Sequence, residues 1–358
     1  MLSNELLRYA TRLGFGELYF KLDHQQQFYA IVAIHSTERG PSLGGCRFVE
    51  YASLEEAIRD ALCLARGMSY KAALANLPLG GGKTVVIRPQ RIRNRSRYFR
   101  MLGRFIHSLN GRYIIAMDSG VTLRDMDNIA LETPFVVTTS KYQGNPAPYT
   151  ALGIIRGMEA AVKFKFNTNN LSGLHVAIQG VGQVGYHVAK YLQERGVRLT
   201  VSDTNKETLR QCLATLTVDV SSPQDIYASK CDVFAPCALG GVLNQTSIPQ
   251  LKATIVAGAA NNQLTCDNDG FLLQKKSILC APDYVINAGG LMYACAEYHH
   301  CINQTKILQQ INGIKSALLT IFEQAQAEKK SPFIVADAIA ESRLTQAAQQ
   351  PACVVECP

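Results

Sequence analysis

The chain has 358 residues, of which 47% are apolar and 18% are charged, a composition typical of a globular protein and not of a disordered one. Lys and Arg number 36 against 28 Asp and Glu, which gives a formal net charge of +8. This modest excess is compatible with an anionic ligand or with ordinary solvated surface. The length suggests two domains, since a domain usually holds about 100–200 residues.

Neither a membrane nor a nucleic acid is expected as a partner. The longest uncharged apolar stretch, Tyr284–Ala296, is too short to cross a bilayer, and residues 1–5 do not begin a signal peptide. The basic run Arg88–Arg100 has two adjacent aromatic residues, Tyr98 and Phe99, and no RNA-binding motif. The eleven cysteines lack zinc spacing, and several lie in apolar runs, so we expect reduced thiols, no metal and a cytoplasmic location.

The first half of the chain reads as an α/β domain. Ser53 and Glu56 have the spacing of a capping box, and apolar residues then recur at helical spacing to about Ala75. Apolar runs predict strands over Phe28–Ile34, Thr84–Ile87, Tyr113–Met117 and Phe135–Thr138.

The second half alternates strand-like and helical stretches, which indicates βαβ units and a mostly parallel sheet. The cluster at 143–148, rich in Gly and Pro, is a breaker, and we expect the hinge just before it. The predicted helices cover Thr150–Phe164, Val184–Glu194 and the chain from about Thr305. The predicted strands are Leu174–Gln179, Leu199–Asp203, Val233–Ala235, Ile255–Ala257 and Tyr284–Ile286.

A dinucleotide-binding motif follows the first strand of this half. Residues 180–185 spell GxGxxG between a predicted strand and a predicted helix, which is the context that the motif requires. Asp203 lies at the end of the next strand, where a carboxylate binds ribose hydroxyls and repels a 2′-phosphate. NAD is therefore expected in preference to NADP. The motif residues are Gly180, Val181, Gly182, Gln183, Val184 and Gly185.

Two lysines and one aspartate are candidates for chemistry in the first half. Gly80, Gly81 and Gly82 precede Lys83, but the spacing is not that of a phosphate-binding P-loop. Lys71 lies at the end of the predicted helix, so one ammonium could bind a carboxylate while the other, with a lowered pKa, acts as a base. Asp118 ends a predicted strand, where it could be catalytic or a structural cap.

The ordered motifs identify a family likeness from about Gly40 to Ser342. The chain resembles the Glu/Leu/Phe/Val dehydrogenases, most closely the leucine and phenylalanine branch. The matching motifs are Gly40-Pro41-Ser42-Leu43-Gly44-Gly45-Cys46-Arg47, Gly67-Met68-Ser69-Tyr70-Lys71, Gly80-Gly81-Gly82-Lys83, Asp118, Gly144-Asn145-Pro146, the glycine motif, Ala235-Pro236-Cys237-Ala238-Leu239-Gly240, Ala259-Ala260-Asn261-Asn262-Gln263-Leu264 and Ala281-Pro282-Asp283-Tyr284-Val285-Ile286-Asn287-Ala288-Gly289-Gly290.

The resemblance implies a two-domain α/β enzyme with a cleft between a substrate domain and a Rossmann-type domain. The substrate and catalytic domain is assigned to 1–134, the dinucleotide-binding domain to 135–329, and a helix over about 330–358 is expected to return to the first. Lys71 would hold the substrate carboxylate, Lys83 would activate water, and Asp118 would exchange a proton with the amino group. The other implied contacts are Gly44, Gly45 and Asn262 with substrate, and Thr150, Cys237, Ala238, Ala260 and Asn261 with cofactor.

The implied activity is reversible, NAD-dependent oxidative deamination of an L-amino acid to the 2-oxo acid and ammonium by a homo-oligomer, from dimer to octamer. The pocket positions Leu43, Ala116, Leu291 and Ala294 are uncharged. Ala116 resembles the leucine branch and Leu291 the aromatic branch, while Met117 replaces a usual Glu before the aspartate. Leucine and other branched-chain substrates are favoured, with a phenylalanine or tryptophan dehydrogenase and a non-catalytic NAD-binding regulator as alternatives.

Overall fold

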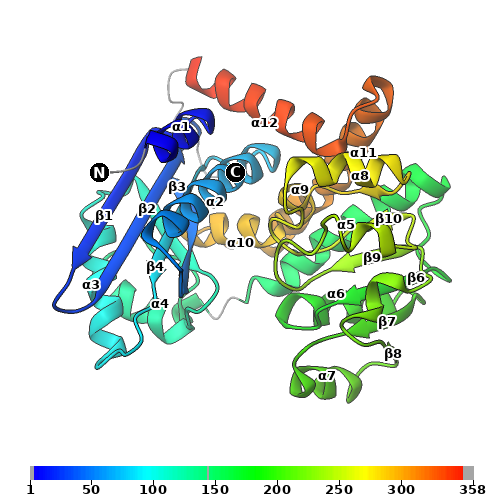
Figure 1. Ribbon diagram of the computed structural model, residues 1–358, viewed down its shortest axis with the longest axis horizontal. Coiled ribbons are helices and arrows are strands. Elements are labelled where there is room, and N and C mark those ends of the chain that lie inside the picture. The colour runs from blue at the N-terminus through cyan, green and yellow to red at the C-terminus, as the bar shows by residue number, and fades with distance from the viewer. Residues whose placement is uncertain (1–3, 143–144, 350–358) are drawn as a thin grey trace. The chain divides into compact units, whose positions relative to one another are not determined.

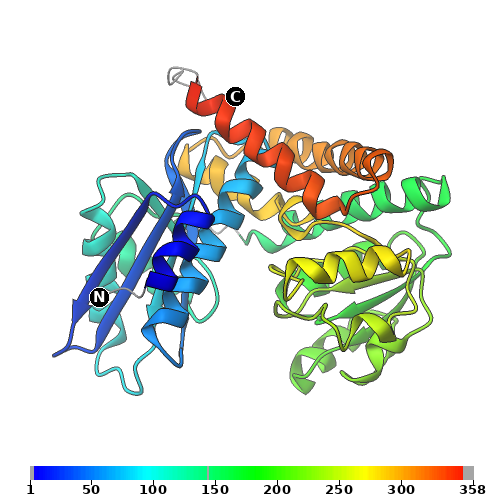
Figure 2. The ribbon, with the colours of Figure 1, turned by 45° about the horizontal axis from the view of Figure 1, so that its top comes forward.

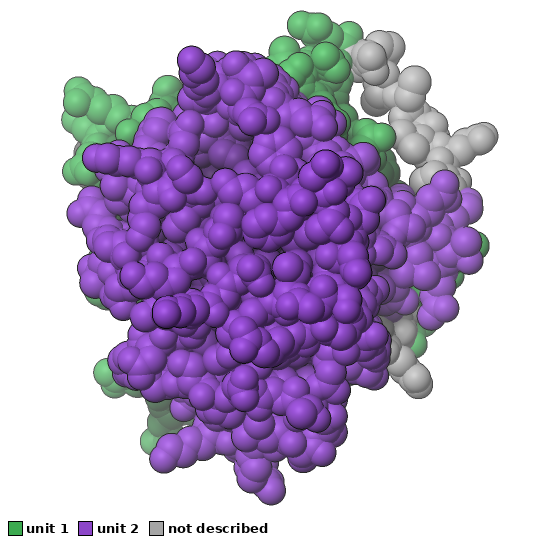
Figure 3. Space-filling view, turned by 90° about the vertical axis from the view of Figure 1, so that its right-hand side faces the viewer, with its two compact units in different colours: residues 1–145, 294–303, 340–358 green, residues 146–293, 304–339 purple. Residues whose placement is uncertain are grey.

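The computed structural model describes residues 4–142 and 145–349. The chain divides into two compact units (Figure 3): unit 1 comprises residues 1–145, 294–303 and 340–358, and unit 2 comprises residues 146–293 and 304–339. Gly144 of the resemblance motifs and the last nine residues of the predicted 330–358 helix lie outside the described residues. No helix in the described part of the chain is long and apolar enough to span a membrane.

Unit 1 is built on a mixed five-stranded sheet in the order β1-β2-β4-β3-β5 (Figure 1). Strands β1 and β2 are antiparallel, β2 and β4 are antiparallel, and β3 is parallel to both β4 and β5. Helices α1 and α2 cover one face, and α3 and α4 cover the other. The bounds are α1 Asn4–Arg12, β1 Glu17–Asp23, β2 Phe28–Ser36, β3 Ser42–Val49, α2 Leu54–Leu74, β4 Gly80–Ile87, α3 Arg95–His107, β5 Tyr113–Met117 and α4 Leu123–Ala130.

The sequence predictions for this unit are confirmed except in one strand. Strand β5 agrees residue for residue, and Ser53 accepts the backbone N–H of Glu56 at 3.1 Å at the start of α2, as the capping box predicts. The predicted strand Phe135–Thr138 is wrong, since it forms only one bridge, from Val136 to Ile115. Its extended run ends at Thr138, whose φ of 61° lies in the left-handed region.

Unit 2 is built on a parallel six-stranded sheet in the order β11-β10-β9-β6-β7-β8. Helices α5 and α11 pack side by side (Figure 2), and α6 packs against α5, while α8 and short 3₁₀ turns contribute to a core on the sheet. The bounds are α5 Ala147–Phe166, β6 His175–Gln179, α6 Gln183–Gln193, β7 Arg198–Ser202, α7 Lys206–Leu213, β8 Asp219–Val220, β9 Val233–Pro236, β10 Ile255–Val256, α8 Asp267–Lys275, β11 Leu279–Cys280, α9 Asp283–Ile286, α10 Gly289–Tyr298, α11 Gln304–Glu328 and α12 Pro332–Gln349.

The predicted strand Tyr284–Ile286 is also wrong, because these residues form the short helix α9. The last strand of the sheet is β11, which ends before Pro282. Proline lacks the N–H that a ladder needs, and Asp283 follows in the first turn of α9, where an acid favours a helix. Buried apolar runs of this length fit either element, so hydrophobicity alone could not distinguish them.

The end of α12 contacts the end of α2 within unit 1. Arg343 donates from Nη1 to the backbone carbonyls of Ala73 and Leu74, at 3.0 Å each, and Tyr70 donates from its hydroxyl to Glu341 at 2.6 Å. Carbonyls in the last turn of a helix lack partners within the helix. Helix α12 therefore caps the turn of α2 that carries Lys71.

Candidate active site

One face of the unit 1 sheet carries the candidate catalytic side chains. Alternate residues of a strand share a face, and α2 lies close to this one, because a Cβ on Gly81 would lie 1.9 Å from the backbone nitrogen of Ser69. The residues on this face are Leu43 and Gly45 on β3, Gly81 and Lys83 on β4, and Ala116 and Asp118 at the end of β5. Three separate segments of sequence thus contribute to one surface.

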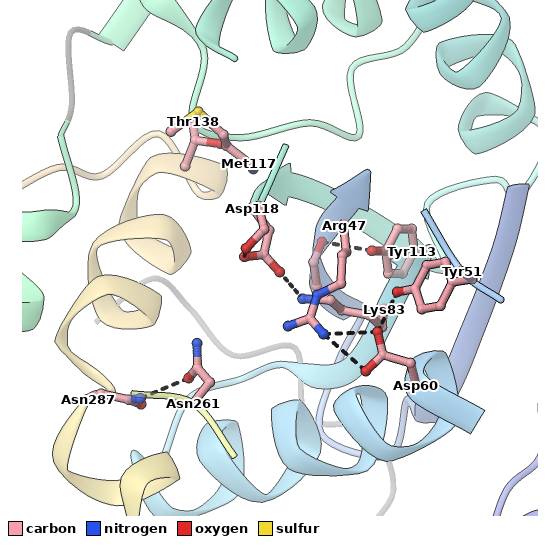
Figure 4. Close-up of polar contacts among 12 residues, drawn as sticks. Arg47, Tyr51, Asp60, Lys83, Tyr113, Met117, Asp118, Thr138, Asn261 and Asn287 are labelled. Carbon is pink, nitrogen blue, oxygen red and sulfur yellow. Dashed lines mark hydrogen bonds and ion pairs between the residues drawn. The ribbon is translucent and has the colours of Figure 1, made fainter. Parts of the chain in front are cut away.

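Lys83 and Asp118 form an ion pair across the strand between them (Figure 4). Strand β3 separates β4 from β5, so the two residues start from strands about 9–10 Å apart. The lysine side chain spans this gap over Gly45, where a Cβ would lie 2.7 Å from the Cβ of Asp118. A residue without a side chain is therefore needed at Gly45. Neighbouring Gly44 accepts a hydrogen bond on its carbonyl from the Tyr113 hydroxyl at 2.7 Å.

The surroundings of this pair stabilise its ionised form. Lys83 is only 5% exposed. Burial alone would raise the pKa of Asp118, but the Lys83 ammonium and, more weakly, the Arg47 guanidinium hold that pKa below its usual value. A buried ammonium beside a carboxylate is suited to proton transfer once a third polar group reaches it.

Arg47 belongs to a second polar cluster beside the pair. It donates from Nη1 to both carboxylate oxygens of Asp60 on α2, at 3.0 and 2.9 Å, and Tyr51 donates to the same carboxylate at 2.5 Å (Figure 4). Arg47 was part of a quoted motif but received no role from the sequence. Asp60 was not predicted as a site residue, because the periodicity of a helix does not show which of its acidic side chains contacts an arginine on a strand elsewhere in the sequence.

Lys71 lies in the last turn of α2 and is half-buried. Its position depends on two contacts of that helix: the close approach of Ser69 to Gly81 and the cap supplied by Arg343. The structure thus places Lys71 on the helix that covers the sheet face of Lys83. On that face, Lys83 and Asp118 are in direct contact.

The glycine motif of unit 2 forms the expected turn between β6 and α6. Gly180 has a φ of 92°, which favours glycine, and a Cβ on Gly185 would lie 2.0 Å from the Gly180 carbonyl oxygen. Gly182 is the N-cap of α6, has no side chain to cap it, and would place a Cβ in open space. The three glycines therefore provide the turn, the open approach and the close packing that a phosphate-binding loop requires.

Asp203 follows β7 and stabilises the glycine loop through a hydrogen bond. One carboxylate oxygen accepts the N–H of Val181 at 2.9 Å, and the other accepts the N–H of Asn205 at 2.8 Å. A carboxylate has about four acceptor sites, so these two bonds leave capacity for a ligand hydroxyl. Gln183 and Val184 begin α6 beside this loop.

The remaining cofactor candidates follow neighbouring strands. Sheet order reverses between β6 and β9, and ligands of open α/β sheets bind at such a switch point, beyond the carboxyl ends of the strands. Cys237 and Ala238 directly follow β9, and the Ala238 backbone would lie 2.9 Å from a Cβ on Gly180. Burial raises the pKa of the Cys237 thiol to about 12, so it is no nucleophile at neutral pH. Ala260 donates its N–H to the Pro236 carbonyl at 2.9 Å.

Two asparagines beyond β10, Asn261 and Asn262, are held by Asn287 and Asp283, for which no role was predicted from the sequence. The side chain of Asn287 donates to Asn261 at 2.8 Å (Figure 4), and Asp283 accepts the N–H of Asn262 at 2.9 Å. Asn262 has a φ of 50°, a conformation that asparagine tolerates. Asn287 and Asp283 belong to the quoted motif 281–290, which was the available signal.

Thr150 lies on α5 within unit 2. It donates to the Pro146 carbonyl at 3.1 Å, and a Cβ on Gly290 would lie 2.5 Å from its hydroxyl oxygen. The four predicted pocket residues are all buried: Leu43 and Ala116 on the unit 1 sheet, and Leu291 and Ala294 on α10. Leu291 falls in unit 2 and Ala294 in unit 1.

Comparison with known proteins decides the family. The model of the Glu/Leu/Phe/Val dehydrogenase dimerisation domain matches residues 17–135, and the Glutamate/Leucine/Phenylalanine/Valine dehydrogenase model matches residues 204–351. The chain is a member of the Glu/Leu/Phe/Val dehydrogenase family. The family comprises amino-acid dehydrogenases, so the protein is an oxidoreductase. The glycine motif at 180–185 falls between the two matched segments.

Relatives of this family member cover nearly its whole length. Leucine dehydrogenase of Geobacillus stearothermophilus is 44% identical over 95% of this chain and 93% of its own. L-tryptophan dehydrogenase of Nostoc punctiforme is 41% identical over 95% of this chain and 96% of its own. The crystal structure of L-tryptophan dehydrogenase from Nostoc punctiforme superimposes with a TM-score of 0.82 at 39% identity, over 96% of this chain and 100% of that one. The resemblance and the two-domain α/β fold predicted from sequence are thus confirmed.

Proposed function

We propose that this family member catalyses the NAD-dependent oxidative deamination of a branched-chain L-amino acid, with leucine favoured, to the 2-oxo acid and ammonium. The observation that carries the proposal is the Lys83–Asp118 ion pair across Gly45, in which the ammonium is buried and the carboxylate is half-buried. A regulatory protein that only binds NAD would have no need for a buried ammonium in contact with a half-buried carboxylate, since burying charge costs free energy.

The residues of unit 1 suit the proton transfers of this reaction. Asp118 is ionised through its contact with Lys83, so it can accept a proton from the substrate ammonium. Lys83 then loses its carboxylate partner and can transfer a proton to or from the water that attacks the oxidised carbon. Lys71 supplies a positive charge for the substrate carboxylate, and α12 caps the helical turn from which it projects.

The residues of unit 2 fit a dinucleotide. When bound, NAD would accept the hydride that leaves the substrate carbon. Its pyrophosphate would lie against the open approach at Gly182, where the N-terminus of α6 favours negative charge. Asp203 retains acceptor capacity for a ribose hydroxyl and would repel a 2′-phosphate, which supports NAD over NADP.

The preference for a branched-chain substrate rests on the apolar candidates and on the relatives. Leu43, Ala116, Leu291 and Ala294 carry no charge that could pair with a glutamate side chain, and leucine dehydrogenases lie among the relatives at 43–44% identity. Tryptophan and phenylalanine dehydrogenases, at 41% and 39% identity, keep the aromatic alternative open. One methylene changes specificity by only about 1–3 kcal/mol, so assays must decide.

We further propose a homo-oligomer in the cytoplasm. The family model matched by residues 17–135 is that of a dimerisation domain. The cysteines described by the structure are all free thiols, which suits a reducing compartment. Size-exclusion chromatography with light scattering would measure the assembly, and a mass equal to one chain would contradict it.

The proposed activity is tested by following NADH formation at alkaline pH with each L-amino acid in turn, with NAD and then NADP. We expect the highest kcat/KM with leucine, isoleucine or valine and with NAD. Lys83→Ala should abolish turnover and preserve NADH binding, while Lys21→Ala on the exposed side of β1 should change neither. Folded protein that binds NADH but oxidises none of the amino acids would support the regulatory alternative instead.

A further inference from the structure

Thr138 is held in a conformation that its side chain disfavours. Its φ of 61° lies in the left-handed region, where a β-branched residue is a genuine outlier. The residue is 4% exposed, so packing and hydrogen bonds must hold it there. Backbone strain of this kind clusters at functional sites.

A buried carboxyl group holds the Thr138 backbone. Glu297 on α10 accepts the Thr138 N–H on Oε1 at 2.7 Å and is 1% exposed. Its other oxygen is buried and has no hydrogen-bond partner among the residues that the structure describes. Burial raises the pKa of Glu297, and the N–H groups of Thr138 and Thr139 oppose this only in part. Placing a carboxyl group here is costly.

The side chain of Thr138 is directed at the end of β5. Its hydroxyl oxygen accepts the backbone N–H of Met117 at 2.7 Å and donates its proton to the Val137 carbonyl at 2.5 Å. Strand β5 is the edge strand of the sheet, and on its outer side the segment 135–138 forms a single bridge, from Val136 to Ile115, so the Met117 N–H is received by a side chain and not by a strand carbonyl. Met117 is the residue before Asp118, and Thr138 lies beside it in Figure 4.

We propose that Glu297 and Thr138 are positioning residues that fix the backbone at Met117 and thereby aim Asp118 at Lys83. Glu297 keeps Thr138 in its left-handed conformation, and that conformation presents the hydroxyl to Met117. The inference rests on the proposed function for its effect on turnover. Its structural part concerns a single backbone N–H and can be measured without turnover.

The decisive comparison is between variants that keep or remove the hydroxyl. Thr138→Val keeps the β-branched shape, removes the acceptor and should lower kcat about tenfold with a smaller change in KM, since a misplacement of about 1 Å can cost about 100-fold in rate. Thr138→Ser restores the hydroxyl and should recover most of kcat. Glu297→Gln retains an acceptor and should resemble Thr138→Ser, whereas Glu297→Met should resemble Thr138→Val.

A matched control lies in the same segment. Thr133 is also buried and accepts a backbone N–H, from Phe135 at 3.3 Å, but this hydrogen bond lies within its own segment and does not reach β5. Thr133→Val should leave kcat unchanged. Equal losses in Thr133→Val and Thr138→Val would overturn the proposal, because they would indicate a general packing effect.

Hydrogen exchange at the Met117 amide separates this inference from the proposed function. We expect faster exchange in Thr138→Val and Glu297→Met than in wild type, with Thr138→Ser and Thr133→Val unchanged. Unchanged exchange and unchanged kcat in Thr138→Val would refute the positioning role. If wild type oxidises no amino acid, the proposed function fails, and the exchange result alone still decides whether the two residues hold Met117.

Discussion

Replacing Gly45 by alanine tests how the ion pair crosses the sheet. The new Cβ would lie 2.7 Å from Cβ and 3.3 Å from Cγ of Asp118, whereas carbon atoms pack at about 3.5–4.0 Å. The aspartate must therefore move by about 1 Å, away from Lys83. A misplacement of this size can cost about 100-fold in rate, which corresponds to about 2.7 kcal/mol of transition-state stabilisation.

The assay is kcat/KM for the best amino acid, together with the NADH dissociation constant and the free energy of unfolding. Overpacking should destabilise unit 1 by about 1–3 kcal/mol, while NADH binding should not change. Gly313→Ala is the control, since its Cβ meets nothing within 4 Å in the middle of α11. Wild-type kcat/KM in Gly45→Ala would refute the reasoning, because Asp118 would then tolerate displacement.

Three further outcomes follow from the electrostatics and burial. The pKa of Asp118 is depressed in the folded protein. Its contribution to stability is therefore present above the ordinary pKa of about 3.9 and is lost as the pH falls through the pKa of the folded state. Acid unfolding of Asp118→Asn should depend less on pH between these two pKa values than that of the wild type. Asp60→Ala should destabilise the protein by about 1.5–3 kcal/mol in urea unfolding, because it removes charged hydrogen bonds from Arg47. A loss below about 0.5 kcal/mol, which is the scatter of surface substitutions, would contradict this. Maleimide should label exposed Cys63 in the native protein but reach buried Cys46, whose pKa burial raises, only after unfolding, as peptide mass spectrometry would show.

Much of unit 2 was predictable because its signals are local. The strand, the glycine turn and the helix at 175–193 are contiguous, and the structure shows a steric reason for Gly180 and Gly185 and an open approach at Gly182. Asp203 was likewise placed from its spacing, although its hydrogen bond to Val181 became visible only in the structure. The error at Tyr284–Ile286 arose because a short, buried apolar run shows neither helical nor strand periodicity.

The sequence by itself determined the family, the α/β class and the identity of the candidate catalytic groups, because these depend on residue types in a fixed order. Only the tertiary structure decided that Lys83 contacts Asp118 over Gly45, since no single segment of the sequence specifies the order of the strands in the sheet. It alone decided that Asp60 faces Arg47 and that Glu297, 159 residues from Thr138 along the chain, accepts its N–H. Contacts of this kind depend on which strands and helices become neighbours, and the packing of the whole core selects those neighbours.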